Sequence, residues 1–141
     1  MKEERKRLAR LKRLEKIRAI AKQTAAMESA QAESTLTQLR ALSDRTRQMA
    51  SDYASRREMT DGGSLHQVGR FVSGLQALTK TTDGDALRAQ SIADAKQRLL
   101  VEAERRRAAI EERALLQERM IAKAGQTPAL GSRKGSGTDL E

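Results

Sequence analysis

A pair of adjacent glycines near the middle of the chain limits its folding more than any other feature. They lie in the run from Thr60 to Ser64, which reads Thr-Asp-Gly-Gly-Ser, between two charge-rich and alanine-rich arms of similar length. Glycine costs about 1 kcal/mol relative to alanine inside a helix and tolerates positive φ. The run therefore predicts a turn at residues 59–64. Ser64 and Gln67 fit a capping box, which predicts that a helix restarts at Leu65.

Both arms carry apolar residues at three- and four-residue spacing, which is the pattern of an amphipathic helix. We therefore predict an all-α fold, a long two-helix antiparallel coiled-coil hairpin, with helix 1 over about residues 3–58 and helix 2 over about residues 65–124. Because both helices rise about 1.5 Å per residue, residue i of the first arm should face a residue near 124 minus i. This rule places Tyr53 opposite Phe71 and Leu14 opposite Ile110.

The same pattern predicts which residues form the seam between the helices. On the first arm they are Ala21, Ala25, Ala32, Leu39, Leu42, Met49 and Tyr53, and on the second Leu87, Ile92, Leu99, Ala103, Ile110, Ala114 and Ile121. The stretch from Leu65 to Leu78 is the most hydrophobic in the chain and covers more than a narrow seam. Its surplus apolar residues indicate either packing around the turn or a docking surface.

Two further glycines divide the second arm. Asp83-Gly84 predicts a weak point or a short kink near residues 81–85, although a continuous helix is favoured because only one glycine is present. Gly125 fits a helix C-cap, and Pro128 should stop any continuation. We therefore expect a hairpin domain over residues 1–124 and a disordered tail over residues 125–141.

Composition excludes a thick globular core. The chain has 141 residues with no Cys, no Trp, one Tyr and one Phe, while 33% of its residues are charged. Such a composition is typical of a long helix or coiled coil. Without cysteine there is no disulfide framework and no thiolate metal site. No apolar run of signal-peptide or membrane-spanning length occurs, so we expect the protein to be cytoplasmic.

Positive charge gathers in two segments of the chain. The formal net charge is +9; residues 1–18 carry +6 and residues 96–124 carry +3, whereas residues 59–95 carry −1. Folding the hairpin should bring the two basic segments together. Leu8, Leu11, Leu14 and Ile17 recur at every third residue through the first of them. This cationic, apolar-striped segment indicates either a footprint for an acidic partner, a nucleic acid or a membrane surface, or a solvated helix end.

Residues that carry enzymatic chemistry are scarce. His66 is the single histidine, and no second histidine or cysteine accompanies it to complete a metal site. Gly62-Gly63 lacks the Lys-Ser/Thr of a phosphate loop, and a two-helix fold offers no pocket that excludes water. We therefore predict no catalytic residues, no cofactor, no metal and no enzyme activity.

Taken together, these features resemble the FliJ-type flagellar export proteins and their relatives in virulence type III secretion, which are small, basic, cysteine-poor antiparallel coiled coils. The resemblance runs from about Leu8 to Ala124. It rests on three elements: Leu11-x-x-Leu14 in the basic helix, Phe71-x-x-x-Leu75 after the turn, and the Arg/Glu-rich run from Ala103-Glu104-Arg105-Arg106-Arg107 through Glu118-Arg119.

The resemblance implies a role in bacterial flagellum biogenesis and motility as a stalk that couples the export ATPase ring to the cytoplasmic domain of the export gate, and as an escort that handles export chaperones. It implies that Leu11, Leu14, Arg106 and Ile110 face the ATPase, and that Phe71 and Leu75 face the gate or a chaperone. Such a protein would act at the cytoplasmic face of the inner membrane, held there through its partners only. Whether a flagellar or a virulence system is served stays open.

Two alternatives come from other classes of protein. A nucleic-acid-binding helical protein would use the arginines between Arg5 and Arg18 and those of 105–107 against phosphates, but no aromatic residue lies near them for stacking. No nucleic acid is therefore expected as a partner. A generic coiled-coil adaptor, in monomeric or dimeric form, is the other alternative.

Overall fold

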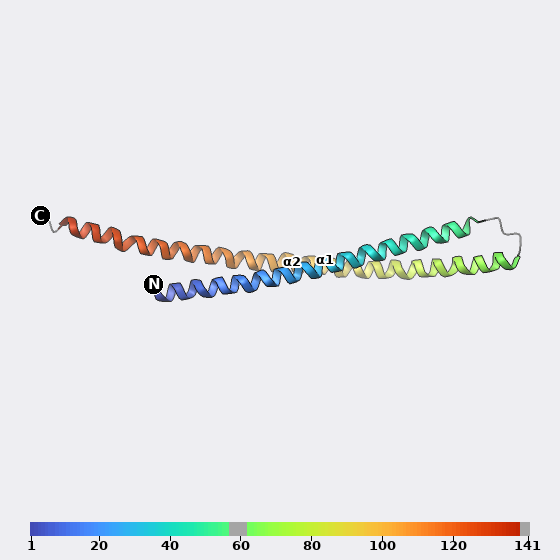
Figure 1. The fold of residues 1–141 in the computed structure, drawn as a ribbon, viewed down its shortest axis with the longest axis horizontal. Helices are drawn as coiled ribbons and strands as arrows, with labels where there is room; N and C mark the ends of the chain where they lie inside the picture. The colour runs from blue at the N-terminus through green and yellow to red at the C-terminus, as the bar shows by residue number, and fades with distance from the viewer. Residues whose placement is uncertain (57–61, 139–141) are drawn as a thin grey trace. The chain divides into compact units, whose positions relative to one another are not determined.

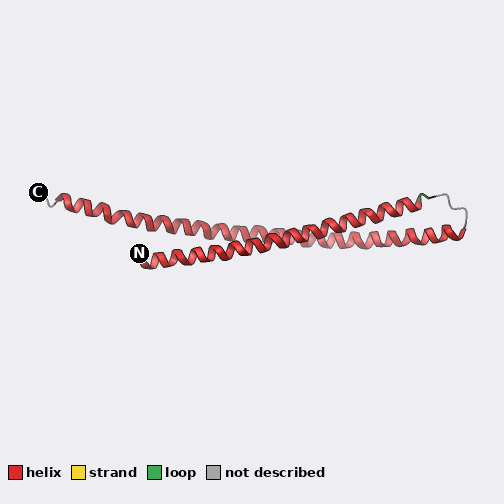
Figure 2. Ribbon diagram, viewed as in Figure 1, coloured by secondary structure: helices red, strands yellow, loops and turns green. Residues whose placement is uncertain are grey.

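The structure, a computed structural model, describes residues 1–56 and 62–138, with side chains described as far as Gln126. Two helices make up these residues: α1 spans Lys2–Ala54 and α2 spans Gly62–Thr138. Helix is the only regular secondary structure in the described residues (Figure 2). The two helices pack against each other in opposite directions, so the predicted all-α helical hairpin is confirmed.

By their contacts the residues fall into two units, and each contains a stretch of α1 alongside a stretch of α2 (Figure 1). The terminal unit combines Met1–Ala25 with Leu100–Glu141. The central unit is the continuous segment Ala26–Leu99, which contains the connection between the helices. The packing of the helices differs between the two units.

In the central unit, the residues shielded from water recur at alternating spacings of three and four along both helices. This is the heptad repeat of a coiled coil, whose positions are named a to g and whose a and d residues face the partner helix. Leu36, Ala89 and Ala93 form the buried core, against which Ala32, Leu39 and Ala86 pack. The a and d residues that are shielded from water are Ser29, Ala32, Leu36, Leu39, Ser43, Thr46, Ala50 and Tyr53 on α1, and Val68, Val72, Leu75, Thr79, Thr82, Ala86, Ala89, Ala93 and Lys96 on α2.

This seam differs from the predicted one in its residues. Leu42, Met49, Leu87, Ile92 and Leu99 were expected inside, but all five are exposed. Their neighbours in the sequence take the inner positions: Ser43 replaces Leu42, Ala50 replaces Met49, and Ala93 replaces Ile92. The physical reason is that small side chains let two helices approach closely, and the 3.5-residue repeat then fixes every later position.

Hydroxyl groups in the seam are hydrogen-bonded, which removes most of the cost of burying them. Thr79 Oγ1 donates to the carbonyl of Leu75 at 2.8 Å, and Thr82 Oγ1 donates to the carbonyl of Leu78 at 2.8 Å. The hydroxyls of Thr46 and Thr79 also meet across the seam, 2.8 Å apart. A buried hydroxyl costs free energy only when it lacks such partners, so threonine is tolerated where the sequence pattern favoured leucine.

The terminal unit has a seam of mixed polarity. Its a and d positions are Glu4, Leu8, Leu11, Glu15, Arg18, Lys22 and Ala25 on α1, and Leu100, Ala103, Arg107, Ile110, Ala114, Gln117 and Ile121 on α2. Ile110, Ala114 and Gln117 are the buried members. Charged side chains at such positions weaken a coiled coil but specify its register through the partners they need.

The helix ends near the connection differ from the predicted boundaries. α1 ends at Ala54 and was expected to reach residue 58, of which residues 57 and 58 lie outside the described part of the chain. Ser55 Oγ donates to the carbonyl of Asp52 at 3.0 Å, and the amide of Arg56 donates to the carbonyl of Tyr53 at 3.3 Å. The last carbonyl oxygens of a helix lack partners within the helix, and these bonds satisfy two of them where α1 ends.

α2 begins at Gly62, three residues before the predicted start at Leu65, so Ser64 lies within the helix and is not its N-cap. Residues 59–61 of the predicted turn lie outside the described part of the chain. Gly62 and Gly63 have no positive φ, so the conformational freedom of glycine is not used at these two positions.

Farther along, α2 is continuous through Gly84, so of the two alternatives for residues 81–85 the favoured one, a continuous helix, is confirmed. It also continues to Thr138, whereas residues 125–141 were predicted as a disordered tail. A glycine C-cap needs positive φ, which Gly125 does not adopt. Pro128 removes one backbone N–H donor without ending the helix.

Candidate functional site

The four residues predicted to face an ATPase all lie in the terminal unit. Leu11 and Leu14 are half-buried, and Arg106 is exposed and forms an ion pair with Glu102 at 2.7 Å. Ile110 is only 7% exposed because it occupies a d position of the seam. Its assignment to a partner-binding surface is therefore corrected to helix packing.

An open groove crosses both helices beside Leu11. It has a volume of about 380 Å³ and is lined by Arg7, Leu11, Arg113, Leu116, Gln117 and Met120. Leu11 and Leu14 also line a second open groove of about 470 Å³ along α1, together with Glu3, Glu4, Arg7 and Arg10. The two leucines thus form apolar floors bordered by arginines and, in the groove along α1, also by Glu3 and Glu4.

A network of ions crosses the seam of the terminal unit at Arg107. The guanidinium donates two hydrogen bonds to Glu104, at 2.8 and 2.9 Å, and one to Glu111 at 2.9 Å. Lys22 on α1 reaches Glu104 at 2.8 Å. The hydrogen bonds from Arg107 and then from Lys22 lower the pKa of the Glu104 carboxyl from 4.5 to about 2. The carboxylates in turn raise the pKa of Arg107.

Many lysine and arginine side chains of α1 form no ion pair with a carboxylate. Among the described residues, no carboxylate lies within 4 Å of the side-chain nitrogens of Arg5, Arg10, Arg13, Lys16 or Arg18. The Nε atom of Arg18 is buried and has no hydrogen-bond partner among the described residues. Of the formal charge of +9, the terminal unit carries +8, from 18 Lys or Arg against 10 Asp or Glu. The electrostatic potential at its surface is therefore positive.

The two residues predicted to face a gate or chaperone differ in burial. Leu75 is a d residue of the central seam and is 8% exposed, so it is also reassigned to packing. Phe71 is exposed, and its ring meets Tyr53 edge to face with the ring centroids 4.8 Å apart. The predicted pairing of these two aromatic residues is confirmed. The guanidinium of Arg56 lies 4.3 Å from the centroid of the Tyr53 ring.

Beside this aromatic pair the surface is hollowed. A pocket of about 350 Å³ is lined by Tyr53, Ser64, Gln67, Val68 and Phe71. Its walls combine two rings, one branched apolar side chain and two polar groups, which is the usual composition of a site for a single anchoring side chain of a partner. Of the predicted pair, Phe71 alone lies on this surface.

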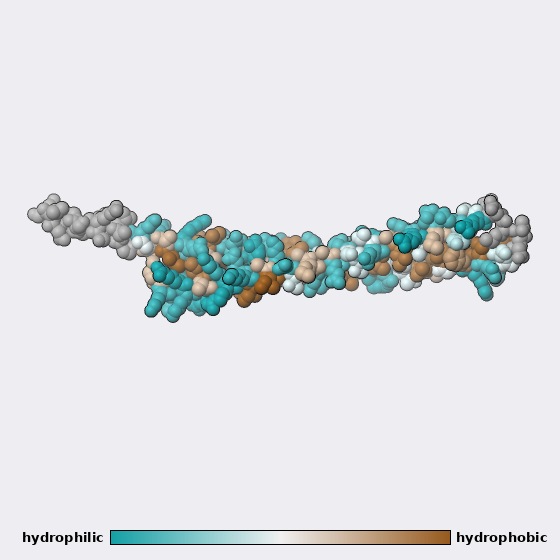
Figure 3. Space-filling view, in the orientation of Figure 1, coloured by the Kyte–Doolittle hydropathy of each residue, from teal (hydrophilic) through white to brown (hydrophobic). Residues whose placement is uncertain are grey.

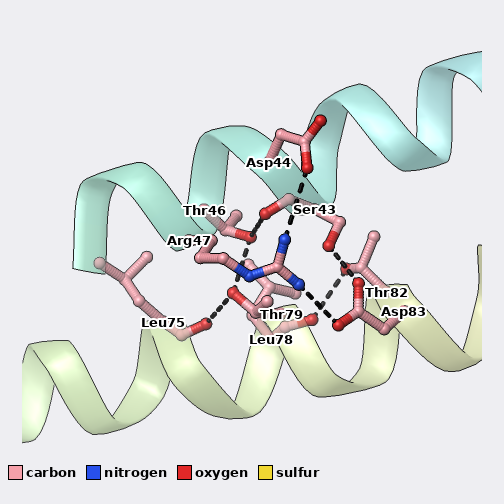
Figure 4. A network of polar contacts seen from close by, with 9 residues as sticks. All are labelled: Ser43, Asp44, Thr46, Arg47, Leu75, Leu78, Thr79, Thr82 and Asp83. Carbon is pink, nitrogen blue, oxygen red and sulfur yellow. Dashed lines mark hydrogen bonds and ion pairs between the residues drawn. The ribbon is translucent and has the colours of Figure 1, made fainter. Parts of the chain in front are cut away.

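Sequence patterns did not indicate the polar contacts that join the helices of the central unit. Asp83 on α2 accepts hydrogen bonds from Ser43 and from Arg47, the latter at 2.9 Å (Figure 4). Arg40 donates to Gln90 farther along the same side of the pair. Arg47, Asp83, Arg40 and Gln90 are all e residues of their heptads, so an e-to-e pairing rule could have found them once the register was known.

Among the described residues, no group of three or more His, Cys, Asp or Glu side chains could hold a metal ion. Neither helix, over its described length, is long and apolar enough to cross a membrane. Comparison of the chain with protein-family models, with curated proteins and with solved structures gives no match.

Proposed function

We propose that the protein is a non-enzymatic component of the flagellar type III protein export apparatus. It acts as a stalk or escort that couples the export ATPase to the export gate and handles export chaperones at the cytoplasmic face of the inner membrane. One observation carries the proposal: a helical hairpin places nearly all of its net charge, +8 of +9, in the unit that holds both termini. The central unit carries +1 and exposes an aromatic anchor.

The terminal unit is the ATPase-facing part in this proposal. Its unpaired cations Arg10, Arg13 and Lys16 would draw it toward an acidic ring, because clustered charge of one sign raises the rate of association with the opposite sign. Leu11 and Leu14, at the base of the arginine-bordered grooves, would then supply apolar contact. Arg106 is held by Glu102 and contributes charge at the same unit.

The central unit is the gate- or chaperone-facing part. Phe71 is the residue we assign to it, because an exposed aromatic ring beside a pocket is the usual centre of a small protein interface. Tyr53 supports the ring from the other helix, which limits the side-chain entropy lost on binding. The protein would thus couple nucleotide turnover in one partner to transport by another without doing chemistry itself.

The test is binding to the export ATPase encoded in the same genome. Purified chain immobilised through its C-terminus should retain the ATPase at physiological salt. Reversal of three unpaired cations, Arg10→Glu with Arg13→Glu and Lys16→Glu, should weaken binding at least about tenfold. The matched control is Arg45→Glu with Arg70→Glu and Arg98→Glu, which makes the same charge change in the central unit and should bind as the unaltered chain does.

Two outcomes would contradict the assignment. The first is an intact chain that retains no ATPase under conditions where its circular dichroism shows it to be helical. The second is an equal loss of binding in the two triple variants, because a non-specific dependence on net charge would then account for the interaction.

A further inference from the structure

The two sides of the central seam differ in polarity. In a helix pair, the e residues lie on one side of the a and d seam and the g residues on the other. The contacts Arg47–Asp83 and Arg40–Gln90 join e residues of α1 to e residues of α2. Because the e positions of the two helices border each other, their g positions must share the opposite side.

That opposite side is apolar. Its g residues include Leu42 and Met49 on α1 and Phe71, Leu78, Ile92 and Leu99 on α2, which we call the apolar rim. All six side chains belong to the central unit and are between 37% and 55% exposed. Brown side chains gather on the surface of this unit between the polar ones in the space-filling view (Figure 3). A two-helix coiled coil normally carries charged residues at such positions, so this rim lacks a covering element.

The two acidic residues at g positions beside the rim are already neutralised within the chain. Lys96 donates to Glu28 at 3.1 Å, and Arg88 pairs with Asp85. The c positions that border the rim are Gln67, Gly74, Thr81, Arg88 and Ala95 on α2 and Gln31, Gln38, Arg45 and Asp52 on α1, so six of these nine residues are uncharged. The surface is therefore predominantly uncharged, which suits an apolar partner.

We propose that the apolar rim is covered by the rim of a second copy of this chain, so that two central units associate face to face as a four-helix arrangement. Burying the six side chains on both copies would remove on the order of 1,000 Å² from water, which is at the lower limit for a biological interface and fits a dimer of moderate affinity. An isologous pairing matches each patch with itself. The central unit suits this because its net charge is only +1 and the two surfaces repel each other little.

Self-association of this kind has a recognisable dependence on salt. Each copy carries +9, almost all of it in the terminal unit, so two copies repel at long range and screening by salt should strengthen their association. Binding to an acidic partner would weaken with salt instead. Phe71 belongs to the rim, so, given the proposed function, the self-associated chain would withhold this residue from a gate or chaperone.

The test is sedimentation velocity on the full chain over a range of concentrations up to roughly 100 µM, where association of micromolar affinity is complete. We expect species of 15.6 kDa at low concentration and of twice that mass at high concentration, with a larger dimer fraction in higher salt. Leu78→Glu and Leu42→Glu, one on each helix, should each raise the dissociation constant at least about tenfold.

The matched control is Leu87→Glu, because Leu87 is a b residue outside the rim and, at 72% exposure, is more exposed than Leu78. It should leave the dissociation constant unchanged, and circular dichroism should show equal helix content in all variants. A chain that stays monomeric at every concentration and salt would overturn the proposal, as would a dimer that Leu87→Glu weakens as much as the rim variants do. Neither result bears on ATPase binding, which depends on the terminal unit.

Discussion

Thr46 and Thr79 face each other across the seam of the central unit, with their hydroxyl oxygens 2.8 Å apart. The Thr46 hydroxyl oxygen also lies 3.0 Å from the carbonyl oxygen of Ser43, and the Thr79 hydroxyl oxygen lies 2.8 Å from that of Leu75. Each hydroxyl has one proton, so whichever threonine donates across the seam, the other accepts there and donates to its own carbonyl, in a site closed to water.

This pairing predicts a non-additive double-mutant cycle. Thr79→Val should lower the free energy of unfolding by about 0.5–1.5 kcal/mol, since it removes one partner of a buried hydroxyl. Thr46→Val with Thr79→Val should be more stable than either single variant, because no hydroxyl is then left with an incomplete set of partners. Urea denaturation followed by circular dichroism measures all four chains. Additive losses would show that the two hydroxyls do not interact.

A second prediction concerns the direction of the helices in the terminal unit. Lys12 on α1 lies 3.0 Å from Glu118 on α2. Spin labels on cysteines introduced at these two positions should therefore be within roughly 25 Å, since packed helix axes lie about 10 Å apart. The absence of native cysteine makes the labelling specific.

The control for this measurement is dilution with unlabelled chain, which leaves an intramolecular distance unchanged. A parallel dimer of straight helices would separate the two labels of one chain by roughly 150 Å. Loss of the short distance on dilution would mean that the contact forms between chains, and the hairpin would be excluded.

The third prediction is a dependence on pH that originates at Glu104. Its pKa falls from 4.5 to about 2 in the folded chain, so its contribution to stability is complete above pH 4.5 and is lost as the pH falls toward 2. The melting temperature of the unaltered chain should exceed that of Glu104→Gln at pH 7, and the difference should shrink between pH 4.5 and pH 2. Glu112→Gln is the control, because Glu112 has no cation within 4 Å among the described residues. If the difference in melting temperature stays constant between pH 4.5 and pH 2, Glu104 does not cause the dependence on pH.

A fourth prediction tests the continuity of α2 at Gly84. The helix there has ordinary dihedral angles, and a Cβ added at this position would find only the end of the Arg88 side chain, at 3.8 Å. Gly84→Ala should therefore raise the free energy of unfolding by about 0.5–1 kcal/mol, since alanine favours helix and narrows the unfolded ensemble. Thermal denaturation measures the change. A destabilised variant would indicate that the chain bends at Gly84 in solution.

The register of the seam shows which features a pattern of apolar residues can predict and which it cannot. Leu42 and Ser43 are adjacent, and a pattern based on hydrophobicity places the leucine inside, yet the serine takes the seam position. Apolar residues occur at a, d and g, which together form a face wider than the contact between two helices. Hydrophobicity cannot decide which strip of that face is central when a small hydroxyl residue finds a partner in the seam, as Ser43 does by donating to Asp83 on the other helix.

The predicted site residues are likewise divided between buried and exposed positions. Phe71 and Leu75 lie four apart and would be placed together by their spacing, but one is exposed on the apolar rim and the other is buried in the seam. Arg106 and Ile110 are divided in the same way. Neighbours on a helix face are thus separated into packing and binding residues by the position of the second helix.

The sequence by itself determined that the chain is helical, that it doubles back near its middle, that Tyr53 meets Phe71, and that positive charge collects in the segments of both arms farthest from the turn. These follow from composition, from glycine and from the constant rise of a helix, all of which are local properties. Tertiary structure alone decided which strip of each helix is buried, how Asp83 and Arg107 are partnered, and which apolar side chains are left exposed. Those depend on how closely two particular helices approach, a property of the pair that neither arm contains.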